Sequence, residues 1–228
     1  MNNQLTELLT NYGPIGAIWF DGLWDQPDDF NWGLDKQYAL IHKLQPACLI
    51  GNNHHKSPFP GEDFQMFERD LPGENKAGLS GQSISTLPLE TCETMNGMWG
   101  YKIKDQNYKS VNELIHLLVR AAGKGANLLM NIGPQPNGEL PAVAVERLKG
   151  VGEWMSKYGE TIYGSTSGNV VTASWGTTTR KGNTLYIHIL SQKMPEFVTL
   201  PLNEKVISAT LFDTGEKVKY EKIQGGIV

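Results

Sequence analysis

One carboxylate ends a strand-like run near the start of the chain. Residues 16–20 are apolar and aromatic, and the run stops at Asp21, which Gly22 follows. A continuous apolar run of this kind is typical of a strand buried in a parallel sheet. In a barrel of alternating strands and helices, the active site is built at the carboxyl ends of the strands. Asp21 is therefore a catalytic candidate, and the alternative is an ordinary Asp-Gly turn after a strand.

A second acid beside Asp21 would allow hydrolysis with a pair of carboxylates, one of them a general acid. Glu68 ends the short extended run 64–67 and has aromatic neighbours in the sequence, which favour the protonated carboxyl that a general acid needs. Glu90 also follows an extended segment and is the reserve candidate. For either glutamate the alternative is a salt bridge or a solvated loop, and Arg69 is a ready partner for Glu68. The other acids considered are Glu62 and Glu93.

Aromatic residues are concentrated around these acids. Sugar rings have apolar C–H faces that stack on aromatic planes, so tryptophan near paired acids indicates a carbohydrate site, with core packing as the alternative. His54 and His55 follow a predicted strand, where they either donate hydrogen bonds to sugar hydroxyls or form a solvated turn. The aromatic residues concerned are Trp19, Trp24, Trp32, Trp99 and Tyr101.

Helices and strands must alternate up to about residue 160 to position these side chains. Ser110 followed by Glu113 forms a capping box at the start of one helix. Internally apolar strands that alternate with helices predict a parallel α/β arrangement. The predicted helices cover 2–12, 34–45, 110–124 and 141–158, and the predicted strands cover 15–20, 47–51, 64–68, 87–92 and 126–132.

The sequence pattern changes after Gly164. Short alternating runs separated by Gly, Asn and Pro turns predict an antiparallel β module. We therefore expect an α/β region over 1–163 and an antiparallel β-sandwich over 164–228. The predicted strands of the second region cover 170–174, 184–190, 196–200, 206–212 and 217–221.

Composition argues against several classes of partner. The 228 residues carry a formal charge of −4 without a basic cluster, which disfavours nucleic acid and anionic membrane surfaces. No stretch approaches the roughly 18 apolar residues of a membrane span. No signal peptide is visible after Met1, which leaves the localisation unknown. Neither a metal-ligand spacing nor a phosphate loop is present, and Cys48 and Cys92 are expected to be buried free thiols.

Five segments together resemble glycoside hydrolase family 29, the α-L-fucosidases. They cover residues 17–22, 67–73, 99–101, 125–134 and 150–164, and the last two are the most distinctive. The resemblance extends over essentially the whole chain. It implies a (β/α) TIM-like barrel followed by a β-sandwich, and a retaining exo-α-L-fucosidase that acts on fucosylated oligosaccharides or glycoconjugates. It implies no metal and no organic cofactor.

The resemblance also implies roles for single residues. Asp21 matches the nucleophile, Glu68 lies at the usual position of the acid/base, and Glu90 matches a second recurring acid. Trp99 matches an aromatic wall against the fucose methyl group, and Asn53 or His54 occupies a loop that touches sugar hydroxyls in relatives; Trp19 belongs to the nucleophile motif. Double displacement follows, with the two carboxyl groups about 5–5.5 Å apart.

One departure from the family affects the expected assembly. Relatives carry a further stretch before the position of Met1, with early barrel strands and a His-His pair that binds fucose. An incomplete barrel exposes apolar surface, at a cost of roughly 25 cal/mol per Å², and an unpaired strand edge invites association. We therefore expect self-association into a homo-oligomer, or completion by a separate chain. The alternatives are an inactive fragment or sugar-binding remnant, and a retaining glycosidase of another specificity, such as galactoside cleavage.

Overall fold

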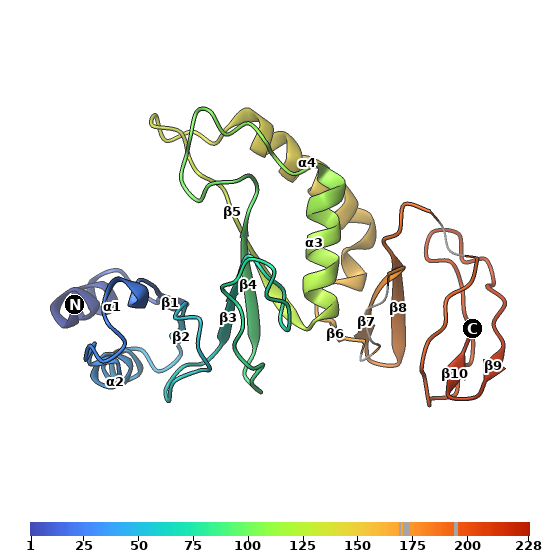
Figure 1. The fold of residues 1–228 in the computed structure, drawn as a ribbon, viewed down its shortest axis with the longest axis horizontal. Coiled ribbons are helices and arrows are strands. Elements are labelled where there is room, and N and C mark those ends of the chain that lie inside the picture. Colours follow the sequence, from blue (N-terminus) through green and yellow to red (C-terminus); the bar gives the residue numbers. More distant parts are fainter. Residues whose placement is uncertain (169, 171–173, 194–195) are drawn as a thin grey trace.

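The computed structural model describes residues 1–168, 170, 174–193 and 196–228. The chain runs from α1 at one end of an elongated molecule to β9 and β10 at the other (Figure 1). The helices are α1 (Asn2–Asn11), α2 (Leu34–Leu44), α3 (Val111–Gly123) and α4 (Ala142–Tyr158), with short 3-10 helices η1 (Leu23–Asp25) and η2 (Gly159–Thr161). The strands are β1 (Ala17–Phe20), β2 (Leu49–Asn52), β3 (Gln65–Glu68), β4 (Leu89–Thr94), β5 (Ala126–Asn131), β6 (Thr166–Ser167), β7 (Gly176–Lys181), β8 (Thr184–Ile189), β9 (Lys222–Ile223) and β10 (Gly226–Ile227).

Strands β1 to β5 all run in parallel. β1 pairs with β2, and β3, β4 and β5 pair in that order. A single parallel bridge between Gly51 and Phe64 joins the two groups. Gly51 permits this close approach, because a Cβ at that position would overlap the Phe64 ring. The predicted parallel α/β arrangement is confirmed, and the carboxyl ends of these strands meet at one edge.

Helices α1 and α2, which precede and follow β1, pack together in one hydrophobic core cluster. Leu5 and Leu9 of α1 are buried there with Tyr38 and Ile41 of α2. The sequence predicts an apolar face of Leu5, Leu8, Leu9 and Tyr12 for α1; only half of it is right, because Leu8 and Tyr12, which directly follows α1, are exposed.

Two further sequence predictions are confirmed. The capping box predicted at Ser110 and Glu113 is present at the start of α3. Cys48 and Cys92 are free and buried. None of the helices in the described ranges is long and apolar enough to cross a membrane.

The region after Gly164 is antiparallel, but its strands differ from those predicted. β6, β7 and β8 form one sheet, and β9 pairs with β10. The prediction for 184–190 is confirmed by β8, and most of 170–174 lies outside the described residues. The run 217–221 contributes only a single bridge, through Lys217. The runs 196–200 and 206–212 contribute only single bridges in their described parts, through Leu200 and Thr210.

The failure of these strand predictions has a physical reason. Alternation predicts a strand only where one face is buried, yet Phe197 is 68% exposed and Ile207 is 88% exposed. β7 was not predicted, because its run of threonines at 177–179 has no apolar alternation. Those threonines are nevertheless buried.

Candidate active site

Three strand ends bring Asp21, Asn53 and Glu68 together. Phe20 of β1 is in register with Asn52 of β2, so the next residues, Asp21 and Asn53, leave the sheet side by side. The Asn53 side-chain amide Nδ2 donates to Glu68 Oε2 at 2.8 Å and lies 3.4 Å from Asp21 Oδ1. Asn53 is buried, the Glu68 side chain is 15% exposed, and Asp21 is exposed. The amide nitrogen of Asn53 therefore links the Asp21 and Glu68 side chains at the carboxyl ends of the parallel strands.

His55 completes this group, although the sequence analysis selected His54. His55 Nε2 lies 3.5 Å from Glu68 Oε2. His55 has a φ of 58° and Arg69, directly after Glu68, has a φ of 59°. This left-handed conformation is uncommon outside glycine, and such residues cluster at functional sites. The only sequence signal for His55 was its place in the His-His pair.

The structure places His54 in a buried network behind the site. His54 Nε2 lies 3.0 Å from Glu62 Oε1, its Nδ1 accepts the backbone N–H of Lys56 at 3.0 Å, and its ring stacks on Phe59. Glu62 also accepts the Tyr38 hydroxyl at 2.9 Å, and burial raises the pKa of Tyr38. His54 and Glu62 therefore hold the loop after β2, and neither is brought into the group around Asn53.

Glu90 is the second residue of β4, so the prediction that it lies at the end of a strand is wrong, and its side chain extends toward β1. Its Oε1 accepts the indole N–H of Trp19 on β1 at 3.3 Å. Burial raises the pKa of Glu90, and the hydrogen bond from Trp19 opposes part of that rise. β1 and β4 are separated by β2 and β3, so in a flat sheet they would lie about 14 Å apart. The contact between Trp19 and Glu90 therefore requires a strongly curved sheet.

Cys92 lies among the three acids. It is in register with Glu68 across the β3–β4 pair. Burial raises the pKa of the Cys92 thiol to about 12, and the charges of Glu68, Glu90 and Asp21 add to the rise. The thiol is therefore neutral at physiological pH. Its surroundings show that three strands direct carboxyl groups toward one region.

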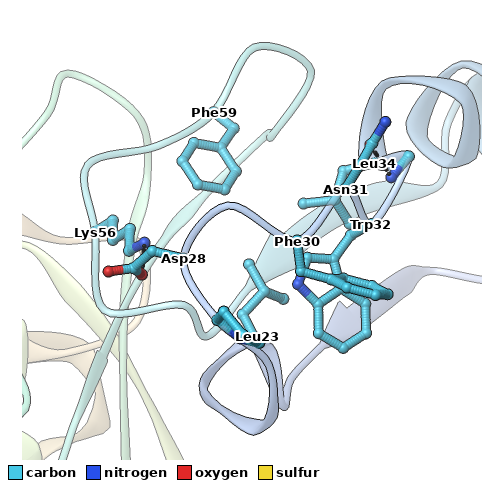
Figure 2. Close-up of a pocket in the computed structure, with 10 residues that line it drawn as sticks. Leu23, Asp28, Phe30, Asn31, Trp32, Leu34, Lys56 and Phe59 are labelled. Carbon is cyan, nitrogen blue, oxygen red and sulfur yellow. Dashed lines mark hydrogen bonds and ion pairs between the residues drawn. The ribbon is translucent and has the colours of Figure 1, made fainter.

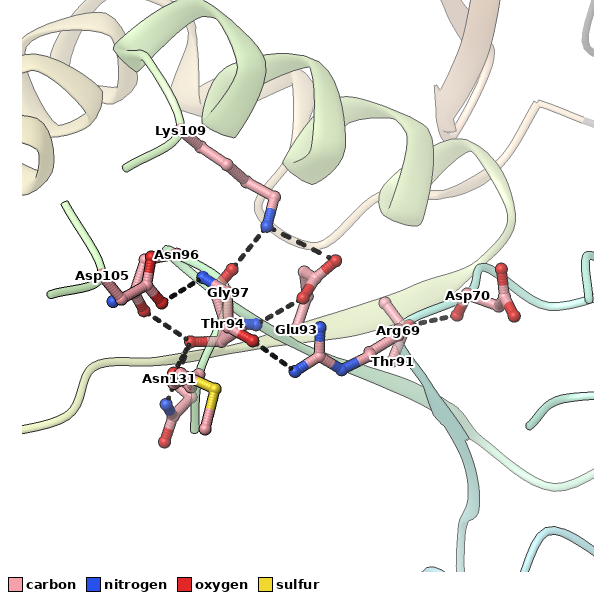
Figure 3. Close-up of polar contacts among 11 residues, drawn as sticks. Arg69, Asp70, Thr91, Glu93, Thr94, Asn96, Gly97, Asp105, Lys109 and Asn131 are labelled. Atoms are coloured by element: carbon pink, nitrogen blue, oxygen red, sulfur yellow. Dashed lines mark hydrogen bonds and ion pairs between the residues drawn. The ribbon is translucent and has the colours of Figure 1, made fainter. Parts of the chain in front are cut away.

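The loop after β4 presents Trp99 beside Arg69. The Arg69 guanidinium lies 4.8 Å from the centroid of the Trp99 ring and donates to the Gly97 carbonyl at 3.1 Å. Asn131 of β5 donates to the Trp99 carbonyl at 2.7 Å. Asp105 accepts the Gly97 N–H at 2.9 Å (Figure 3). The contacts from Arg69 and Asp105 to Gly97, and from Asn131 to Trp99, hold the loop that carries Trp99. Trp99 is therefore linked through Arg69 to the end of β3.

Glu93, the remaining acid considered, is occupied elsewhere. Its carboxylate accepts the backbone N–H of Thr94 at 2.7 Å and lies 3.5 Å from Lys109 Nζ. Figure 3 shows Glu93 directed toward Lys109. Within the described ranges, no group of three or more His, Cys, Asp or Glu side chains is arranged to hold a metal ion.

A small pocket lies between the loops that follow β1 and β2 (Figure 2). Its volume is about 230 Å³. Leu23, Phe30 and Trp32 line it from the first loop, and Lys56 and Phe59 line it from the second.

Comparisons with known proteins identify relatives over most of the chain. A family model described as alpha-L-fucosidase matches residues 1–160. The tissue alpha-L-fucosidase of Mus musculus is 31% identical over 221 residues, which cover 91% of this chain and 46% of that protein. The plasma alpha-L-fucosidase of Rattus norvegicus is 30% identical over 168 residues, which cover 70% of this chain and 34% of that protein. The chain thus spans less than half the length of these curated relatives.

Solved structures resemble the whole chain. The alpha-L-fucosidase isoenzyme 1 from Paenibacillus thiaminolyticus has a TM-score of 0.78 and 32% identity, covering 100% of this chain and 56% of that chain. A trapped covalent intermediate of an alpha-L-fucosidase from Bacteroides thetaiotaomicron, with 2-fluoro-fucosyl fluoride, has a TM-score of 0.81 and 26% identity. That match covers 99% of this chain and 55% of the other.

Proposed function

Because the chain belongs to the α-L-fucosidase family of glycoside hydrolases, we propose that it hydrolyses terminal α-L-fucosides with retention of configuration. One observation carries the proposal: Asn53 Nδ2 lies within hydrogen-bond reach of both Asp21 Oδ1 and Glu68 Oε2. Those two oxygens are therefore no more than about 6 Å apart. A retaining pair needs about 5–5.5 Å, whereas an inverting pair needs about 6.5–9.5 Å. The covalent intermediate trapped in the Bacteroides thetaiotaomicron relative supports the same chemistry.

The proposed reaction has two displacements. Asp21 attacks the anomeric carbon of fucose while the bond to the leaving oxygen breaks, and Glu68 gives that oxygen a proton. A fucosyl ester of Asp21 results. Glu68 then takes a proton from water, the water oxygen bonds to the anomeric carbon, and Asp21 leaves as a carboxylate. Asn53 holds the Asp21 and Glu68 side chains in place.

The other site residues have binding roles in this proposal. Trp99 forms an apolar wall for the fucose methyl group, and Trp19 and Glu90, which are hydrogen-bonded to each other, contact the sugar. Asn53 Oδ1 is buried and has no hydrogen-bond partner in the described part of the chain. His55 replaces His54 as the proposed histidine contact, because only His55 lies beside Glu68.

Glu90 is the alternative acid/base. Its raised pKa favours the protonated form that a general acid needs at the start of the reaction. Glu68, by contrast, accepts the Asn53 amide N–H and lies beside His55. The spacing to Asp21 favours Glu68, and the paired variants described in the Discussion distinguish the two.

Covalent labelling tests the proposed function directly. We expect 2-fluoro-fucosyl fluoride to add one fluorofucosyl group to Asp21 of the 228-residue chain, detected by mass spectrometry of peptides. Asp21→Asn should abolish labelling and lower kcat/KM for 4-nitrophenyl α-L-fucoside at least about 10³-fold, because it removes the nucleophile.

A matched control comes from the loop after β1, which begins with Asp21. Asp29→Asn changes an exposed acid in that loop, outside the group around Asn53, and should leave turnover unchanged. Equal turnover by the wild type and Asp21→Asn would contradict the proposal and favour a sugar-binding remnant. Stronger inhibition by D-galactose than by L-fucose would instead favour galactoside cleavage.

We also propose that the curved sheet is part of a (β/α) barrel, followed by a β-sandwich, and that a second copy of the chain covers its open edges. The contact between Trp19 and Glu90 supports the curvature. Within the described residues β1 pairs only with β2, and β5 only with β4, while Leu49 and Leu129 are each about half exposed. Light scattering coupled to size exclusion should give a dimer or larger. A stable monomer would contradict this assembly.

A further inference from the structure

We infer that the pocket between the β1 and β2 loops binds the sugar on the leaving-group side of the scissile bond. This inference rests on the proposed fucosidase activity and specifies the substrate: a fucose attached to a neutral sugar ring. The pocket is lined by residues that the proposed reaction does not use (Figure 2). Four observations support the inference: the position, the aromatic walls, the charged pair and the size of the pocket.

Two residues that line the pocket, Leu23 and Lys56, closely follow residues of the proposed site in the chain. Leu23 lies two residues after Asp21, and consecutive Cα atoms are 3.8 Å apart, so the pocket begins within about 8 Å of the Asp21 backbone. On the other side, Lys56 directly follows His55, whose Nε2 lies 3.5 Å from Glu68 Oε2. A ring joined to fucose through the anomeric oxygen would extend from between these acids into the loops beside them.

The walls of the pocket are aromatic and well positioned. Phe30 and Trp32 form an edge-to-face pair with centroids 4.9 Å apart, and the Trp32 carbonyl accepts the Gln37 side chain at 2.7 Å. Phe59, on the opposite side, is held against the His54 ring with centroids 4.2 Å apart. Phe30 is nevertheless 48% exposed. An aromatic face that is fixed but open to solvent suits the C–H face of a sugar.

A charged pair supplies polar groups at the pocket. Lys56 Nζ lies 2.8 Å from Asp28 Oδ1, and both side chains remain largely exposed, at 51% and 94%. Together they offer a donor and an acceptor for sugar hydroxyls. Because the two charges neutralise each other, the pocket favours a neutral ring over a phosphate or a carboxylate.

The size of the pocket limits its occupant. Pockets that enclose a drug-sized ligand usually measure roughly 300–1,000 Å³. At about 230 Å³ this one has room for a single ring. Longer glycans would continue outward past Asp28 and Lys56.

Two substrates with different leaving groups test the inference. An α-L-fucosyl-galactose disaccharide places a ring in the pocket, whereas α-L-fucosyl fluoride does not. Phe30→Ala should lower kcat/KM for the disaccharide at least about tenfold and leave that for the fluoride within about twofold. Lys56→Met, on the opposite wall, should act in the same direction. The matched control is Phe197→Ala, which truncates a distant exposed phenylalanine and should change neither value.

A binding measurement separates this inference from the proposed activity. The Trp32 indole N–H signal, assigned by its loss in Trp32→Phe, should shift in NMR spectra on titration with methyl β-galactoside, and the shift should be smaller in Phe30→Ala. An equal loss on both substrates, or a disaccharide value unchanged in Phe30→Ala, would overturn the pocket while the activity stands. A shift without any turnover would retain the pocket as a sugar site and refute the activity. If the NMR signal does not shift and no turnover is found, both the pocket and the proposed activity are refuted.

Discussion

The parallel strands β1–β5 and the antiparallel strands β6–β8 bury polar side chains in different ways. In the parallel region, Asn53 bonds to Glu68 and Trp19 bonds to Glu90, each pair joining different strands or their ends. In the antiparallel region, the buried polar groups are the threonines of β7, and Thr179 bonds to the Thr161 carbonyl and to His188 Nε2. Parallel strands end at one edge and concentrate polar residues there, whereas antiparallel neighbours end at opposite edges.

This difference predicts where substitutions act. Changes at the ends of β1 to β4 should alter turnover with little loss of stability, because those side chains lie at the edge of the sheet. Changes around β7 should alter stability with little effect on turnover. The three predictions below test this separation, from the largest effect to the smallest.

The largest effect concerns the two glutamates. Glu68→Gln should lower kcat/KM for a fucosyl disaccharide about 10²–10³-fold, because the leaving oxygen no longer receives a proton. Added azide should restore release of nitrophenol from the aryl fucoside and yield the α-fucosyl azide. Glu90→Gln should lower activity less and show no such rescue. Thermal unfolding should differ little from wild type for both variants.

The reverse result would reassign the roles. If azide rescues Glu90→Gln but not Glu68→Gln, then Glu90 is the acid/base and Glu68 is a binding residue. The alkaline limb of the pH profile gives an independent readout, since burial raises the pKa of Glu90 and only the true acid controls that limb. A large loss of stability in either variant would contradict the separation of the two regions.

The second effect concerns pH and stability in the antiparallel region. Burial lowers the pKa of His188 to about 4, so the folded chain keeps this histidine neutral where the unfolded chain binds a proton. The contribution of His188 to the free energy of unfolding is therefore fully present above pH 6.5. It falls by about 2–3 kcal/mol as the pH drops toward 4.

Urea unfolding at pH 7 and pH 4.5 measures this contribution, with His188→Gln as the comparison. The variant keeps a donor for Thr179 but cannot titrate, so its stability should fall less over this range. The carboxylates that titrate elsewhere affect both proteins alike. Identical losses in the two proteins would contradict the assignment to His188.

The smallest effect lies where the two regions meet. Gly123, at the end of α3, faces Thr177 of β7, and a Cβ there would overlap the threonine hydroxyl. Gly123→Ala should therefore destabilise the chain by about 1–3 kcal/mol. Gly152→Ala in α4 meets open space and should stabilise it by about 0.5–1 kcal/mol. Denaturant midpoints measure the stability change of each variant, and the two changes should have opposite signs. Fucoside turnover should be unchanged in both.

Local pattern predicted much of the parallel region. The apolar runs before Asp21 and Glu68 end where their strands end, and the capping box at Ser110 marks the start of α3, because periodicity and capping depend on nearby residues. The antiparallel region was predicted less well. The apolar residues of 206–212 lack a face to pack against, and the threonines of β7 are buried by contacts with α3 and η2 that no local pattern reveals.

By itself, the sequence determined the parallel strands, the positions of Asp21 and Glu68 at the ends of two of them, and the family. Only the tertiary structure decided which of two adjacent histidines lies beside Glu68, because neighbouring residues in a loop point in different directions and the backbone conformation of His55 selects one of them. The curvature that brings Trp19 to Glu90 is likewise tertiary. That contact joins residues far apart in the chain through the summed twist of the strands between them.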